Sequence, residues 1–373
     1  EFTFTMKIIC QKEDLQRGVS IVSKAVPTKT TMPILECILI DAQDGTIHMT
    51  ANDMELGIET VVTGMVEMPG KIALEAKVFS EIVRRLPDNE VSIETDESGT
   101  TTIVCEKAKF AIPGRAGDDF AYLPQVERTK SISLSQFTLK EIVRQTIFSI
   151  SDNENNKMMS GELMEIDNDT LKLVSLDGHR ISIRKVHLKE SYEPIKVVIP
   201  GKTLSDVSKI LSGDNDSQVS LFFTENHVIF EFDETTVVSR LIEGEYFRIN
   251  QMLNSDYETK IIINKKEFLN CIDRATLLVK ESDKKPLILT VTDSNMAVKL
   301  HSALGSLNED IFVEKTGKDI KIGFNPKFLT DALRVIDEET VTLYMVNPKA
   351  PCFIRDEEES YIYLILPVNF TEE

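Results

Sequence analysis

The ten residues Lys202–Leu211, KTLSDVSKIL, decide the fold, because similar stretches stand 125 positions before and 125 positions after them (77, 202 and 327). The earlier copy is Lys77–Leu86, KVFSEIVRRL, and the later copy is Lys327–Ile336, KFLTDALRVI. Apolar residues recur in each copy at i, i+3, i+4 and i+7, and only Ser208 interrupts the pattern. This is the period of an amphipathic helix with one buried face. The sequence therefore predicts three related helices.

Each copy also carries two cations that are seven residues apart. Seven residues make about two helical turns, so the two side chains share one face, roughly opposite the apolar stripe. The six residues are Lys77, Arg84, Lys202, Lys209, Lys327 and Arg334. In a single helix, such a pair would be explained by a solvent-exposed face with no further function. The three copies differ at most other positions but all keep both cations, which indicates a common function for these cations. Binding of a long anion that faces all three helices would be such a function.

Composition and charge limit the possible functions. The chain has 373 residues and a formal net charge of −19, which is enough length for two or three domains and excludes general sticking to nucleic acid. Any DNA-binding face must therefore be local. Five scattered cysteines (Cys10, Cys37, Cys105, Cys271 and Cys352) are expected to be buried free thiols in a reducing cytosol rather than metal ligands. We find neither a membrane-length apolar run nor a signal peptide, so we expect a cytoplasmic protein with no membrane partner.

The order of predicted elements runs three times along the chain. We expect an α+β fold of three similar domains, 6–128, 129–256 and 257–373, each an internally doubled unit with two helices on one face of antiparallel strands. Glu1–Thr5, before Met6, are expected to be a cloning remnant.

Several individual elements are predicted with definite limits. They are a strand at Ile34–Ile40, a helix at Thr138–Ser149, and strands at Gly161–Ile166, Thr170–Ser175 and Arg180–Leu188.

Catalytic motifs are missing from the sequence. Gly201-Lys202-Thr203 ends like a phosphate-binding loop, but that motif needs a glycine at the position of Lys196. The five histidines show no metal-ligand spacing, and no serine or cysteine lies in a nucleophile-elbow pattern. A non-catalytic role without metal or cofactor is favoured.

Four short sequences within the triple repeat resemble those of bacterial sliding clamps, the beta subunits of DNA polymerase III. They are Met32-Pro33-Ile34-Leu35, Asp177-Gly178-His179-Arg180, Ile322-Gly323-Phe324-Asn325 and Leu364-Ile365-Leu366-Pro367-Val368. The resemblance spans Met6–Phe370. It implies the DNA clamp fold, closed as a head-to-tail homodimer ring that encircles duplex DNA and tethers the replicative polymerase. Clamp-loader and repair proteins are implied as further partners.

A ring of this kind requires two chains. If neighbouring helices pack about 10 Å apart, a ring of six helices has an axis-to-axis diameter near 19 Å, which leaves no room for a duplex. A ring of twelve helices has an opening of roughly 30 Å. By position, the resemblance adds three DNA-facing residues to the six helix cations: Lys29, Asn153 and Lys157.

The resemblance also implies a groove that receives short linear motifs of partner proteins. An apolar trough with a few polar side chains at its rim suits capture of a peptide. Phe247 stands where many relatives have proline, and Asn369-Phe370 replaces a commoner basic-aliphatic ending. The expected groove residues are Met159, Leu176, Gly178, His179, Arg180, Ile181, Phe247, Met252, Leu364, Leu366, Pro367, Val368 and Phe370.

We hypothesise that the two subunits meet through apolar residues at the ends of the chain's two outer domains. Phe110 and Ile112 lie on a terminal strand of the first domain, and Leu277 and Leu278 end the first helix of the third. Two other functions stay open at this point. A phosphate-handling enzyme would need buried carboxylates or a metal, and a purely protein-binding scaffold would have no topological hold on DNA.

Overall fold

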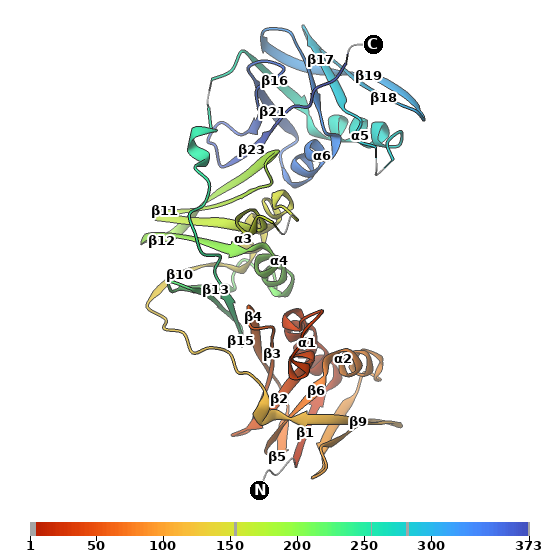
Figure 1. The fold of residues 1–373 in the computed structure, drawn as a ribbon, viewed down its shortest axis with the longest axis vertical. Helices are drawn as coiled ribbons and strands as arrows, with labels where there is room; N and C mark the ends of the chain where they lie inside the picture. Colours follow the sequence, from red (N-terminus) through yellow and green to blue (C-terminus); the bar gives the residue numbers. More distant parts are fainter. Residues whose placement is uncertain (1–4, 153–154, 255, 281–282, 372–373) are drawn as a thin grey trace. The chain divides into compact units, whose positions relative to one another are not determined.

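The computed structural model describes residues 5–152, 155–254, 256–280 and 283–371. Its contacts divide the chain into two compact units: unit 1 is Glu1–Phe137 with Lys209–Leu241, and unit 2 is Thr138–Ser208 with Ile242–Glu373. Every strand pairing in the described residues is antiparallel, so the predicted α+β class with antiparallel sheets is confirmed (Figure 1).

Unit 1 is one continuous sheet of thirteen strands, in the order β10-β13-β14-β15-β4-β3-β2-β6-β9-β8-β7-β1-β5. Helices α1 (Lys12–Val22) and α2 (Ala76–Arg85) contact each other, and each buries one apolar face. The strands are β1 Met6–Gln11, β2 Cys37–Gln43, β3 Thr46–Asn52, β4 Leu56–Val62, β5 Met65–Met68, β6 Gly70–Glu75, β7 Glu90–Thr95, β8 Thr100–Cys105, β9 Ala108–Ala116, β10 Lys130–Ser135, β13 Gln218–Phe223, β14 His227–Phe232 and β15 Thr235–Arg240.

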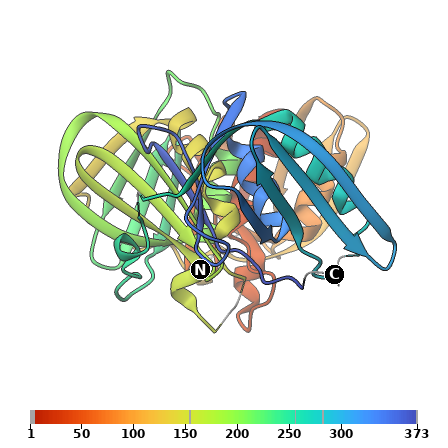
Figure 2. The same cartoon turned by 90° about the horizontal axis from the view of Figure 1, so that it is seen from above.

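Unit 2 is built on ten strands in the order β11-β12-β23-β22-β21-β16-β19-β18-β17-β20. Figure 2 shows β11 and β12 as a long curved hairpin. The unit contains α5 (Lys265–Thr276), α6 (Pro326–Val335) and most of α3 (Gln136–Arg144) and α4 (Gly201–Ile210). The strands are β11 Gly161–Leu176, β12 Arg180–Pro200, β16 Thr259–Asn264, β17 Leu287–Thr292, β18 Asn295–Ser302, β19 Gly305–Gly317, β20 Ile320–Phe324, β21 Thr340–Met345, β22 Cys352–Arg355 and β23 Tyr361–Ile365.

The sheets run across both predicted domain boundaries. Strand β15 pairs with β4 through Val237 opposite Ile58, and β12 pairs with β23 through Ile181 opposite Leu364. The middle third of the chain therefore contributes strands to both units, and the predicted boundaries at 128/129 and 256/257 stay a prediction.

Two predicted elements, the strand at Ile34–Ile40 and the helix at Thr138–Ser149, were wrong in their limits. Residues Pro33–Glu36 form a 3₁₀ turn, and the strand begins only at Cys37, because Pro33 suits the first position of a helical turn. Helix α3 ends at Arg144, and a 3₁₀ turn follows at Ile147–Ser149.

The strand predictions of the middle third were too short. The segments Gly161–Ile166 and Thr170–Ser175 are one strand, β11, with irregular register around Asn168. The strand predicted at Arg180–Leu188 continues to Pro200. Short-range alternation signals a strand but does not show where a bulged strand resumes.

Glu162, near the start of β11, is fully buried. Its Oε2 lies 3.2 Å from the hydroxyl of Thr146, and its Oε1 has no hydrogen-bond partner among the described residues. Thr146 directs its single hydroxyl proton towards both Glu162 Oε2 and the carbonyl of Ile142, which lies 2.7 Å away. Burial raises the pKa of Glu162 well above its ordinary value, so the carboxyl group is neutral over a wider pH range than in the unfolded chain.

We predict that Glu162→Gln stabilises the protein increasingly as pH rises from 5 to 8. A raised folded-state pKa contributes stability that is complete below the unfolded pKa and is lost as pH rises towards the folded value. Glutamine stays neutral, so it avoids this loss, which approaches about 1.4 kcal/mol for each pH unit between the two pKa values. Urea unfolding at pH 5, 6.5 and 8 measures the difference, with exposed Glu190→Gln as control. A difference that does not change with pH would contradict the prediction.

Candidate functional site

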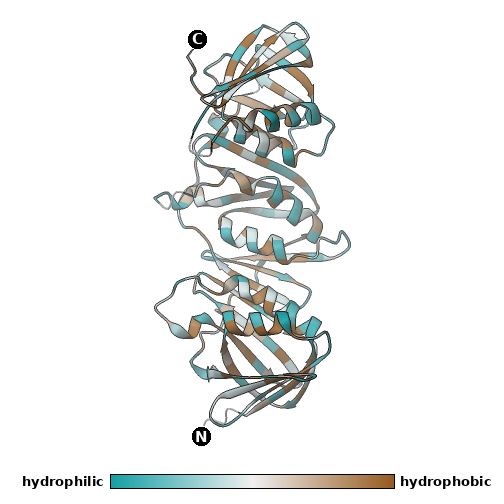
Figure 3. Ribbon diagram, turned by 90° about the vertical axis from the view of Figure 1, so that its right-hand side faces the viewer, coloured by the Kyte–Doolittle hydropathy of each residue, from teal (hydrophilic) through white to brown (hydrophobic). Residues whose placement is uncertain are grey.

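The three repeated stretches are helices α2, α4 and α6, as the sequence predicts. Their apolar stripes are buried, from Phe79 at 0 % exposure in the first copy to Leu204 and Leu329 at 0 % in the others. All six predicted cations (Lys77, Arg84, Lys202, Lys209, Lys327 and Arg334) are exposed. Figure 3 shows apolar and polar residues alternating along the helices, as one buried and one solvated face require.

An acidic residue follows the first lysine of each copy by four positions, a pattern that the sequence analysis missed. Lys202 Nζ lies 3.0 Å from Asp206 Oδ2, and Lys327 Nζ lies 3.9 Å from Asp331 Oδ2. In α2 the acid, Glu81, pairs instead with the two arginines of the last turn. The side chains of Lys202 and Lys327 stay 59 % and 71 % exposed, so these ion pairs are weak and a phosphate group can compete for the lysines.

The other predicted DNA-facing residues lie in connecting segments. Lys29 is exposed in the loop after the first helix, and Lys157 is exposed at the start of a 3₁₀ turn, Lys157–Ser160. Asn153 lies outside the described residues.

Six of the predicted groove residues gather in one apolar cluster of unit 2. Leu176, Ile181 and Leu364 form part of its buried centre, beside Tyr246 and Phe353. The other three pack against it half-buried: Met159, Phe247 and Leu366. Residues from the β11–β12 hairpin, from the segment after β15 and from β23 thus meet at one place.

The hairpin turn at 177–180 holds the next two groove residues. Gly178 has φ +89°, a conformation that favours glycine. His179 is exposed, donates its backbone N–H to Asp177 Oδ1 at 2.9 Å, and accepts the N–H of Leu366 at 2.9 Å. This backbone contact fixes the end of β23 beside the turn. Met252 is 52 % exposed, and Pro367 is half-buried.

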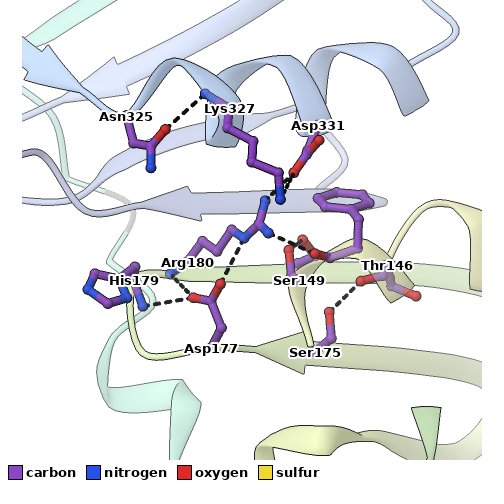
Figure 4. A network of polar contacts seen from close by, with 11 residues as sticks. Thr146, Ser149, Ser175, Asp177, His179, Arg180, Asn325, Lys327 and Asp331 are labelled. Atoms are coloured by element: carbon purple, nitrogen blue, oxygen red, sulfur yellow. Dashed lines mark hydrogen bonds and ion pairs between the residues drawn. The ribbon is translucent and has the colours of Figure 1, made fainter. Parts of the chain in front are cut away.

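Arg180 is buried, at 6 % exposure, and its guanidinium group joins three elements (Figure 4). It donates to Asp177 in its own turn at 3.0 Å, to Asp331 of α6 at 2.7 Å and to the carbonyl of Phe148 at 2.8 Å. It also lies 4.4 Å from the ring centroid of Phe328. With its donors committed in this way, Arg180 positions the turn against α6 and is not a side chain that waits for a ligand.

The last two predicted groove residues lie apart from the apolar cluster. The N–H of Val368 donates to the carbonyl of Gly323 in β20 at 2.8 Å. The ring of Phe370 covers Gly323, where an added Cβ would lie 2.8 Å from it, and Lys321 Nζ lies 5.6 Å from the ring centroid. The structure therefore does not bring Phe370 to the cluster. Because Gly323 has no side chain, the ring of Phe370 packs directly on the sheet at this position.

The predicted dimer residues lie at strand edges and helix ends. Phe110 on β9 is 39 % exposed and Leu277 at the end of α5 is 79 % exposed, while Ile112 and Leu278 are half-buried. Among the described residues, β9 is paired on only one side over 108–113 and β19 on only one side over 305–312. Sequence reasoning missed Leu304 and Phe312, which are 54 % and 66 % exposed at this second edge.

No group of three His, Cys, Asp or Glu side chains that could hold a metal ion is found in the described part of the chain. All five cysteines are buried, and burial raises the pKa of Cys10 and of Cys271 to about 12, which disfavours a reactive thiolate. Within the described ranges, no helix is long and apolar enough to cross a membrane.

Comparisons with known proteins agree along nearly the whole chain. Three family models match: the DNA polymerase III beta subunit N-terminal domain at residues 6–124, the central domain at 133–247 and the C-terminal domain at 250–369. The beta sliding clamp of Bacillus subtilis is 34 % identical over 98 % of this chain and 100 % of its own length, and its crystal structure superposes with a TM-score of 0.94. A putative DNA polymerase III beta subunit from Eubacterium rectale is 66 % identical over 98 % of this chain and 100 % of its own, with a TM-score of 0.95.

We predict that Arg180→Met lowers the free energy of unfolding by about 3 kcal/mol or more, because it leaves the carboxylates of Asp177 and Asp331 without their shared buried cation. The exposed control Arg248→Ala, which loses only a pair with Glu245, should cost less than about 0.5 kcal/mol. Urea denaturation measures both. Similar losses in the two variants would show that Arg180 does not hold the turn against α6.

Proposed function

The chain belongs to the family of bacterial DNA polymerase III beta subunits, the beta sliding clamps, and we propose that its exposed helix cations face the DNA that a closed dimer encircles. As a member of this family it is a processivity clamp for DNA polymerase, with DNA, polymerase and a second copy as partners, and not an enzyme. The phosphate-handling enzyme that the sequence left open is thereby set aside.

The exposed cations at matched positions of α2, α4 and α6 carry this proposal. Each is held on the solvated face by the burial of the opposite stripe, in a chain whose net charge is −19. Lysine and arginine contacts to phosphates are independent of base sequence and weaken with salt, which suits a protein that must slide. The acidic remainder of the surface repels DNA from other faces. Lys29, Lys157 and Asn153 extend the proposed DNA-facing set.

We predict that reversing Lys77, Lys202 and Lys327 together to glutamate weakens DNA binding and flattens its salt dependence. Each lost phosphate contact lowers the slope of log K against log salt by about 0.9 for duplex DNA. The control reverses three exposed lysines outside the helices, Lys130, Lys189 and Lys349. Fluorescence anisotropy with a labelled duplex across a salt series compares the two. Equal slopes for the two triple variants would remove these lysines from the DNA-facing set.

We further propose that the dimer forms where β9 of one subunit meets β19 of the other. Unpaired backbone groups at a strand edge pair readily with another chain, and antiparallel addition would continue both sheets. Phe110 and Ile112 on the first edge, with Leu277 and Leu278 near the second, supply apolar area that association removes from water. Leu304 and Phe312 enlarge the apolar surface at the second edge.

Leu277→Asp should give a monomer at micromolar concentration, because the exposed leucine would become a charge buried without a partner. Multi-angle light scattering measures the mass. The matched control is Met54→Asp, because Met54 is an exposed apolar residue of the β3–β4 turn and lies outside the proposed interface. A Leu277→Asp protein that stays dimeric would place the interface elsewhere.

The apolar cluster around Leu176, Ile181 and Leu364 is the proposed site for short linear motifs of the polymerase, the clamp loader and repair proteins. Exposed Met252 and His179 at its border offer side chains to an incoming peptide, and Met159, Phe247 and Leu366 are only half-buried. An anchoring leucine or phenylalanine of the peptide would join apolar groups that are already gathered. Arg180 and Gly178 serve this site through the shape of the turn.

A further inference from the structure

A surface hollow of about 860 Å³ lies on the C-terminal part of unit 2, beside the chain's last described residues. Four lysines border it: Lys284, Lys285, Lys299 and Lys321. No aspartate or glutamate is among its fifteen described lining residues, although 61 of the 373 residues of the chain are acidic. An average sample of fifteen residues would contain two or three acids. The hollow is therefore a local basic surface on an acidic protein, which attracts anionic groups.

Strand register explains why these lysines share a face. Lys299 stands opposite Ile288, and Lys321 stands opposite Thr290, two residues further along the same strand. Directly paired residues point to the same side of a sheet, and so do residues two apart. The intervening residues Leu289 and Ile322 are buried in the core that also contains Phe268 of α5 and Leu329 of α6. Lys299 and Lys321 therefore lie on the side of the sheet away from the helices.

Among the described residues, few carboxylates compete for Lys284, Lys285 and Lys299. Lys285 Nζ is 4.0 Å from Asp283, the limit of an ion pair. Glu309 on β19 is held by Arg274, and Asp310 accepts from the side chain of Asn295. Lys284 and Lys299 are exposed. Their charge is available to a ligand from solution.

The C-terminal tail connects the apolar cluster to this hollow. Leu366 is bonded to His179 at the cluster, Val368 is bonded to Gly323, and Phe370 lines the hollow. Phe370 follows Leu366 by four positions, a span of at most about 13 Å in extended chain. A peptide anchored at the cluster needs only about four further residues to reach the lysines.

We propose that this basic hollow binds an acidic segment that flanks the clamp-binding motif of a partner protein. The inference rests on the proposed function, because the same peptide occupies the apolar cluster with its motif. Its position on the far side of the sheet from the helices favours a protein segment over the encircled DNA. The acidic flank adds long-range attraction and selects among partners with similar motifs.

Isothermal calorimetry with five synthetic peptides tests the proposal on the full chain. The first peptide carries only a motif with glutamine and leucine anchors. The other four add a four-residue spacer and then four glutamates or four glutamines, at the N-terminal or at the C-terminal end of the motif. We expect one glutamate version to bind about five-fold more tightly than its glutamine counterpart in low salt, and the advantage to shrink as salt rises.

The double variant Lys284→Glu/Lys299→Glu should abolish this preference and leave the affinity of the unextended peptide unchanged. Lys130→Glu/Lys189→Glu, with the same net charge, should keep the preference. If the unextended peptide fails to bind, the proposed motif site is wrong. If it binds and no glutamate version is preferred, only the basic hollow is wrong.

Two other occupants give distinct results that would overturn the proposal. Single-stranded DNA in the hollow would make labelled oligo(dT) binding depend on Lys284 and Lys299 while the glutamate peptides show no preference. Occupation by the chain's own Glu372 and Glu373 would hide the preference in the full chain and reveal it in a chain that ends at Thr371.

Discussion

Burial of one apolar stripe on each repeated helix is the constraint on which the rest of the molecule depends. Phe79, Leu204 and Leu329 leave water completely, and burying a side chain of this size contributes about 2 kcal/mol. Rotating a helix to bury its lysines instead would lose that contribution and add the cost of desolvating charge. The direction of the cations is therefore a consequence of core packing. A chain that is strongly acidic overall can in this way present positive charge on its exposed helix faces.

The second organising contact is the buried guanidinium group of Arg180. It holds the 177–180 turn, which borders the apolar cluster, to Asp331 of α6, and Asp331 also pairs with the exposed Lys327. One carboxylate thus lies between the proposed DNA-facing surface and the proposed motif site. The stacked ring of Phe328 and the carbonyl of Phe148 complete the contacts of Arg180. Separating the buried guanidinium group from its carboxylate partners would leave a buried charge unpaired, which is costly. This arrangement therefore favours a rigid connection between the hairpin and α6.

The sequence predicted features that depend on short-range periodicity and missed those that depend on contacts across the fold. Helices α2, α4 and α6 and the exposure of their six cations could be predicted, because a 3.6-residue period fixes which side chains are buried. The acids at positions 81, 206 and 331 were readable in the same repeat and were overlooked. The role of Arg180 could not be predicted, since Asp331 lies 151 residues away along the chain. The position of Phe370 likewise depends on Gly323, because a side chain there would collide with the ring. This contact cannot be predicted until β20 and the C-terminal tail are known to lie side by side.

A protein that is attached to DNA by enclosing it has different lifetimes on circular and on linear DNA. The protein is loaded onto a nicked circular plasmid by a clamp loader, the plasmid is cut once, and the bound fraction is followed against an uncut sample at moderate salt. Weak phosphate contacts alone cannot retain a protein for long at that salt, whereas a closed ring leaves only through a DNA end. We expect the clamp to stay on the circle and to be lost rapidly from the cut plasmid. Equal loss from both would contradict this expectation.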